Sequence, residues 1–194
     1  MYYAILCVVV ISVVCFNTRV AGDMVRIPLW NGMFSFNAPD GWWVSLTDNL
    51  LSTHAAPDPG ALSRIIFTTP NPFFEGDARD FLQTQLSLYA GNVGMDMERM
   101  DGHQAVIDGF DSYCSTFAMR TGGDNFLGAA FAFDFSGCKV FAMAVAPEDE
   151  FEQYEDVFTK MICSYETDDA KLSEYRENLI ASTGTLWPKM AMKG

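Results

Sequence analysis

The stretch FDSYCSTFAMRTGGDNFLGAAFAFDFSGCKVFAMAVA, residues 110–146, decides the fold of this chain. Alternating and continuous apolar runs separated by glycine turns predict three antiparallel strands: 110–119, 126–135 and 138–146. The second turn places Phe135 opposite Cys138, and two residues further along Phe133 lies opposite Val140. Both sides of this sheet are then apolar, whereas an antiparallel sheet usually leaves one side in water. We therefore expect helices or loops to cover both faces.

Helices are predicted on either side of this stretch along the chain. Asp77 can cap a helix over 78–90, where apolar residues recur at helical spacing. Acidic residues after Pro147 begin a second helix, because carboxylates are favourable at a helix N-terminus. A shorter, more polar helix is expected over 169–181, and 182–194 carries no clear structural signal.

Two further hairpins are predicted before the central stretch. Asn31–Gly32 and Asp101–Gly102 are turn pairs in which both residues accept a positive φ, so each favours a tight hairpin. Between them, residues 48–60 are polar and contain two prolines, which indicates a loop, and 61–69 is expected to be a strand. The fold class predicted is α+β, with a twisted antiparallel sheet covered on both faces.

The N-terminus has the pattern of an export signal. Residues 4–16 are an uncharged apolar run, shorter than the roughly 20 residues that a spanning helix needs. Such a run is typical of a signal peptide, and small residues up to Gly22 predict cleavage there. The expected location is extracytoplasmic, either periplasmic or secreted. Two alternatives stay open: the segment is retained as an anchor, or Cys15 carries a lipid.

The charge of the chain limits its partners. It has 25 acidic and 12 basic residues and a formal net charge of −13. A surface this acidic repels phosphate backbones and anionic lipid, so neither nucleic acid nor membrane contact beyond the N-terminal segment is expected.

Motifs for catalysis or cofactor binding do not occur in the sequence. There is no nucleotide-binding glycine loop, no G-x-S-x-G motif and no C-x-x-C pair. His54 and His103 lack partners at metal-ligand spacing, so no metal or other cofactor is expected. Cys114 as a nucleophile would need a base, for which His103 is the nearest candidate in the sequence.

Three cysteines follow the signal segment, and an exported protein can oxidise a pair of them. The strand that leaves Cys138 runs about 26 Å and the helix that ends at Cys163 returns about 21 Å, which brings the two together. Cys114 lies two strands away from Cys138, too far to bridge. Cys138–Cys163 is therefore the candidate disulfide, and three reduced thiols are the alternative.

Large aromatic residues in predicted turns and loops are candidates for binding a partner, since aromatics dominate protein interfaces. They are Trp42, Trp43, Phe73, Phe74 and Trp187. The alternative is that one tryptophan and one phenylalanine close the ends of the sandwich.

The order of three segments resembles the PsbP-like/Mog-like superfamily, which includes small exported bacterial proteins near DcrB. The segments are FNAPDGWW (36–43), MDGHQAVIDG (100–109) and AVAPEDEFEQYEDVFTKMICSYE (144–166). The resemblance implies an α/β/α sandwich and a binding or assembly role more often than catalysis. It divides the chain into a signal peptide (1–22), a PsbP/Mog-like α+β domain (23–166) and a C-terminal helix and tail (167–194).

The function expected is that of an exported, non-catalytic accessory or binding protein, with an envelope protein as its candidate partner. One alternative is an extracytoplasmic hydrolase whose site assembles only in three dimensions, from carboxylates or from Cys114 and His103. Another is a structural envelope protein tethered by its N-terminus.

Overall fold

The computed structural model describes residues 23–46, 52–107, 109–121, 123–135 and 137–191. Its larger sheet consists of β3 (Trp43–Leu46), β4 (Ser52–Ala56), β5 (Arg64–Thr68), β6 (Asp96–Ile107), β7 (Phe110–Thr121), β8 (Asp124–Phe135) and β9 (Cys138–Pro147). These seven strands are antiparallel, in the order β3-β4-β5-β9-β8-β7-β6. A smaller antiparallel sheet contains β1 (Met24–Leu29), β2 (Phe34–Pro39) and β10 (Glu166–Thr167), with β2 in the middle.

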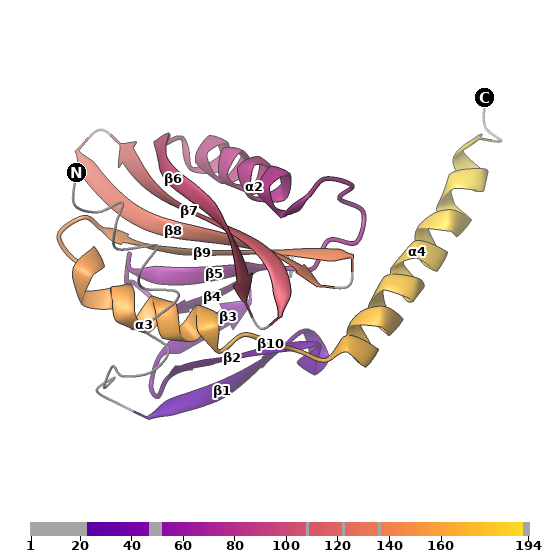
Figure 1. Ribbon diagram of the computed structural model, residues 1–194, viewed down its shortest axis with the longest axis horizontal. Coiled ribbons are helices and arrows are strands. Elements are labelled where there is room, and N and C mark those ends of the chain that lie inside the picture. The colour runs from indigo at the N-terminus through magenta and orange to yellow at the C-terminus, as the bar shows by residue number, and fades with distance from the viewer. Residues whose placement is uncertain (1–22, 47–51, 108, 122, 136, 192–194) are drawn as a thin grey trace.

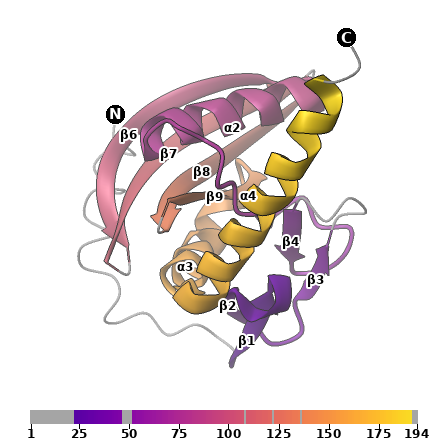
Figure 2. The same cartoon turned by 90° about the vertical axis from the view of Figure 1, so that its right-hand side faces the viewer.

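Helices and the smaller sheet cover the two faces of the larger sheet (Figure 1). One face carries α2 (Ala78–Val93), and the opposite face carries α3 (Phe151–Cys163) together with β1 and β2. The third helix, α4 (Asp169–Ala191), projects away from the domain (Figure 1), and in the turned view of Figure 2 it lies in front of the domain. The predicted α+β class with cover on both faces is confirmed, with two sheets in place of one.

The central meander has the predicted register. Phe135 pairs with Cys138, and Phe133 pairs with Val140. Large phenylalanine side chains on β8 therefore face small ones on β9, which lets α3 and β2 pack closely over this face. The opposite face of the meander carries Phe117 on β7 and Phe141 and Met143 on β9, which pack beneath α2.

One predicted hairpin is wrong. Residues 96–107 form the single strand β6. Its pairing with β7 shifts register between Arg99 and Gly102, as at a β-bulge. A Cβ at position 102 would lie 2.7 Å from the Tyr113 hydroxyl oxygen, so the glycine admits the tyrosine side chain. The Asp-Gly pair therefore marks a bulge with a close tertiary contact, and no turn.

The Asn31–Gly32 hairpin is present with a different connection. A short 3₁₀ turn over Trp30–Gly32 joins β1 to β2, and Trp30 and Asn31 adopt φ values of 45° and 59°. For a residue as bulky as tryptophan this left-handed conformation is strained. Packing of the Trp30 ring edge-on against Phe34, with 5.6 Å between centroids, helps to hold it.

Three further boundaries differ from the predictions. The segment expected to be a loop over 48–60 contains β4, whose Thr53 is completely buried between β3 and β5. The helix α2 continues past Gly91 to Val93, where Gly94 ends it with a φ of 65°. The helix α4 continues past 181 to Ala191, into a segment without a recognisable signal.

The N-terminal predictions fall on residues 1–22, outside the described residues. Within the described part of the chain, no helix combines the length and the apolar character needed to cross a membrane.

Candidate functional site

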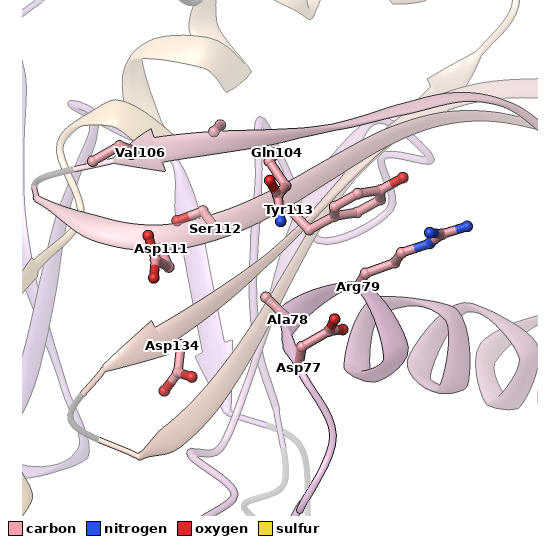
Figure 3. A pocket seen from close by; sticks show the side chains of 10 residues that line it. Asp77, Ala78, Arg79, Gln104, Val106, Asp111, Ser112, Tyr113 and Asp134 are labelled. Carbon is pink, nitrogen blue, oxygen red and sulfur yellow. The ribbon is translucent and has the colours of Figure 1, made fainter.

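A cleft opens beside the N-terminus of α2, above the ends of β6, β7 and β8 (Figure 3). Its volume is about 470 Å³, and one side is open to solvent. The lining residues are Asp77, Ala78, Arg79, Gln104, Ala105, Val106, Asp111, Ser112, Tyr113 and Asp134. They come from four separate elements and include three carboxylates, a phenol and a primary amide.

Strand register determines which side chains face the cleft. Gln104 pairs with Tyr113, and Val106 pairs with Asp111. Because directly paired residues lie on the same face of a sheet, all four side chains are on the side of α2. The helix packs mainly over β7 and β8, so its first turn and the outlying β6 leave the cleft between them.

The three carboxylates of the cleft have different surroundings. Asp134 Oδ2 lies 2.6 Å from the Nζ atom of Lys139, which is buried, whereas the Asp134 side chain is 34% exposed. Asp77 caps α2 by accepting a hydrogen bond from the Asp80 backbone at 2.8 Å. Asp111 takes part in none of the ion pairs of the described residues. Its charge is therefore the one most accessible to a ligand.

Tyr113 lines the cleft, and two arginines lie against its ring. The guanidinium carbons of Arg79 and Arg99 lie 6.0 Å and 5.8 Å from its ring centroid. The Nη2 atom of Arg99 also donates a hydrogen bond to the Tyr113 hydroxyl at 3.3 Å. In Figure 3 the Arg79 side chain extends away from Asp111 and Asp134, which leaves that end of the cleft acidic.

Cys114 and His103 form the second candidate site. They pair directly across β6 and β7, and the Cys114 Sγ atom lies 3.0 Å from the His103 Nε2 atom. This is within the reach required of a nucleophile and its base. Cys114 is 3% exposed and packs with the core beneath α3, on the face opposite Tyr113. The structure thus brings the two residues together, but on the other side of the sheet from the cleft.

The predicted aromatic residues do not form one patch. Trp42 packs edge-on against Tyr154 and Phe158, with both centroid distances 6.3 Å, on the α3 side. Phe74 packs against Phe81 at 5.0 Å, beneath α2 on the opposite side. The two aromatics with exposed side chains are Trp43 and Phe73. Trp187 lies in the last part of α4, over 183–191, where the side chains are outside the described set.

No disulfide bond occurs among the described residues, so the structure does not contain the predicted Cys138–Cys163 pair. Cys138 is completely buried at the start of β9, whereas Cys163 is the last residue of α3 and half-buried. Burial raises the pKa of the Cys138 thiol, and the nearby Arg176 partly opposes this shift.

Metal-ligating side chains do not gather in the part of the chain that the structure describes, where no three His, Cys, Asp or Glu residues could hold an ion together. His54 lies in β4, several strands away from His103 in β6. Burial, together with the positive charge of Arg64, lowers the pKa of His54.

No family model matches the chain, and no curated protein matches it. Its fold is similar to the solution structure of cyanobacterial PsbP (CyanoP) from Synechocystis, with a TM-score of 0.59 over 79% of this chain and 99% of that one. The chain has a PsbP-like fold. The sequence identity is 12%, so the similarity concerns the PsbP-like fold alone.

Two other solved structures are similar at lower TM-scores. One is LpqN, which is involved in cell envelope biogenesis of Mycobacterium tuberculosis, with a TM-score of 0.48 and 14% identity over 75% of this chain and 91% of that one. The other is the protein PA94 of unknown function from Pseudomonas aeruginosa. Its TM-score is 0.42 and its sequence identity 11%, over 69% of this chain and 90% of that one. The similarity to CyanoP alone confirms the PsbP-like fold that the sequence suggested.

The cleft of this PsbP-like fold was not predicted from the sequence. Asp77 was identified only as a helix cap, and Asp111 and Asp134 stand singly in strands. Their convergence depends on where α2 crosses the sheet, which no local pattern encodes. The signal available in the sequence is that Asp111 and Asp134 are charged residues near the ends of strands that are otherwise largely apolar.

Proposed function

We propose that this protein is an exported, non-catalytic accessory protein that binds an envelope protein partner through the acidic cleft beside α2. The observation that carries the proposal is the separation of the two candidate sites. The cleft provides carboxylates, an amide and a phenol, which are binding groups. The nucleophile and base nearest to it, Cys114 and His103, face the opposite side of the sheet. A ligand held in the cleft is therefore out of their reach.

A crosslinking experiment in the native cell tests this function. The full chain with a C-terminal tag is crosslinked, purified and analysed by mass spectrometry, beside the variants Asp111→Asn and Asp124→Asn. Both variants remove one negative charge from an exposed aspartate, but Asp124 lies at the far end of β7 and β8. We expect one stoichiometric envelope partner with wild type and Asp124→Asn, and at least a fivefold lower recovery with Asp111→Asn.

Two outcomes contradict the proposal. If wild type recovers no stoichiometric partner, the accessory role is wrong. If Asp111→Asn recovers the partner as well as wild type does, the cleft is not the binding site. The intact mass of uncrosslinked protein tests export, because cleavage after Gly22 removes residues 1–22, whereas a structural envelope tether retains them.

A second candidate function, a thiol hydrolase, is favoured by the 3.0 Å distance between Cys114 Sγ and His103 Nε2. In this reaction His103 would accept the thiol proton while sulfur attacks the carbonyl carbon of an ester or amide, and would pass that proton to the alcohol or amine that leaves as its bond to the carbonyl carbon breaks. Water, deprotonated by His103, would then hydrolyse the thioester and release the acid and the thiol. The burial of Cys114 opposes it, because a substrate would have to displace the core beneath α3.

Alkylation by iodoacetamide separates the two functions. For a binding protein, we expect Cys114 in the folded chain to react at least a hundredfold more slowly than in the urea-unfolded chain, because its sulfur is shielded. Mass spectrometry of tryptic peptides distinguishes it from Cys138 and Cys163. Rapid labelling of Cys114, together with ester hydrolysis that Cys114→Ala abolishes, would establish the hydrolase instead.

A further inference from the structure

The outer edge of β6 is open to another strand. β6 is the terminal strand of the larger sheet, so along one side its backbone has no neighbouring strand among the residues that the structure describes. The N–H and C=O groups of such an edge can pair with an extended segment of a second chain.

The two halves of β6 differ in how strongly their residues discourage pairing with a strand of another chain. The first half carries Asp96, Glu98, Arg99 and Asp101, and the register shift follows it. Charges and bulges at an edge discourage pairing with other chains. Over 102–106, by contrast, pairing with β7 is regular and no Asp, Glu, Lys or Arg occurs. At the opposite edge of the sheet, β3 has four residues, against twelve in β6.

The unprotected half of β6 forms one wall of the acidic cleft. Gln104 and Val106 line it, and the Val106 residue is 68% exposed. A strand added beside β6 would direct alternate side chains to the same face, at the mouth of the cleft. There the nearest carboxylate is that of Asp111, which is paired with Val106 on the next strand and takes part in no ion pair among the described residues, whereas Asp134 lies one strand further away and is paired with Lys139. Charge complementarity therefore favours a basic side chain at that position.

We propose that residues 102–106 of β6 bind an extended segment of a partner protein as an added strand, and that a lysine or arginine of this segment enters the acidic cleft. The inference rests on the proposed binding function and specifies the chemistry of the partner. Backbone pairing along the edge supplies affinity, and the cleft selects the side chain that is aligned with it.

Two synthetic peptides test the proposal by NMR of the ¹⁵N-labelled full-length protein. They share the sequence acetyl-Thr-Val-Thr-X-Thr-Val-Thr-amide, with X either lysine or glutamate. We expect the lysine peptide to shift the backbone amide signals of 102–106 and of Asp111. The glutamate peptide should bind at least tenfold more weakly, and added salt should reduce this difference.

A matched pair of variants places the peptide on the structure. Val106→Lys puts a positive charge at the mouth of the cleft and should abolish binding of the lysine peptide. Leu88→Lys makes the same change at a residue that is 55% exposed on α2, and should leave binding unchanged. Because both positions are exposed, both variants should fold, which circular dichroism verifies.

Several results would overturn the strand-addition proposal: equal affinity for both peptides, no shift at 102–106 up to millimolar peptide, shifts confined to β3, or unchanged binding to Val106→Lys. The crosslinking experiment keeps the two proposals separate. If wild type captures a partner that Val106→Lys also captures, strand addition is wrong and the binding function stands. If wild type captures none, the binding function itself is wrong.

Discussion

Replacement of Gly128 by alanine is expected to lower the free energy of unfolding by about 3 kcal/mol, at the upper end of the range for overpacked cores. Gly128 pairs with Phe117 across β7 and β8, and the Phe117 ring lies directly over its Cα atom. An added Cβ would overlap this ring and would lie 2.7 Å from the backbone oxygen of Ala144. Phe117 is completely buried and Ala144 is in a central strand, so neither can move aside.

Urea unfolding followed by tryptophan fluorescence measures this loss. Gly91→Ala is the control, since nothing lies within 4 Å of a Cβ there and alanine favours the helix, so stability should rise by up to about 1 kcal/mol. In the Phe117→Leu background, Gly128→Ala should lower the free energy of unfolding by less, because the smaller leucine side chain replaces the ring that the added Cβ would meet. Equal stability of Gly128→Ala and wild type would show that the close contact does not exist.

Replacement of Tyr165 by alanine is expected to cost about 3–5 kcal/mol, the range for removing a large aromatic side chain from a core. Its ring is completely buried, and its centroid lies between 5.2 and 5.7 Å from four other centroids. The four rings belong to Phe34, Phe67, Phe133 and Phe135. Tyr165 thus joins the end of α3 to both sheets, and its loss would leave a cavity where they meet.

Tyr165→Phe provides the matched comparison. The Tyr165 hydroxyl is buried and has no hydrogen-bond partner among the described residues, so removing it relieves a desolvation penalty. We expect this variant to equal wild type or to exceed it by up to about 1 kcal/mol in urea unfolding. A loss above about 1 kcal/mol would mean that the hydroxyl makes a stabilising contact.

Wild type and Tyr165→Phe are also expected to differ in how the free energy of unfolding changes at alkaline pH. Burial raises the pKa of Tyr165 well above its ordinary value of 10.0. Above about pH 10 the unfolded chain releases this proton while the folded chain retains it, so stability falls as pH rises. Tyr165→Phe lacks this proton and should lose less stability between pH 9 and 11. An identical decline in both proteins would contradict the assigned cause.

The register of the central meander could be predicted because it is set by short turns and by residues close to them in the sequence. Glycine turns set the register, and a register error of one residue would have moved the phenylalanines of β8 to the wrong face. Where tertiary contacts decide, the same reasoning failed. The Asp101–Gly102 pair reads as a turn, but the Tyr113 side chain occupies the space above Gly102 and the strand continues through it.

The candidate site could be predicted only in part for the same reason. The sequence indicates His103 as the nearest base to Cys114, and the antiparallel register does place them opposite one another. The cleft depends on how far α2 extends across the sheet and on β6 reaching beyond it. Asp77 and Asp111 are therefore neighbours only in the folded chain, as the close-up in Figure 3 shows.

The helix α4 affects how the protein moves in solution. Leu172 packs into the core and the Tyr175 hydroxyl reaches the Pro70 backbone oxygen at 3.4 Å, so the first turns of the helix are attached to the domain. From Asp169 to Ala191 a helix extends roughly 34 Å at about 1.5 Å per residue, and Figure 1 shows most of this length standing clear of the sheets. A monomer with such an arm diffuses more slowly than a sphere of equal mass. Early elution from a gel-filtration column would therefore not by itself indicate a dimer, whereas sedimentation equilibrium, which is independent of shape, would distinguish the two.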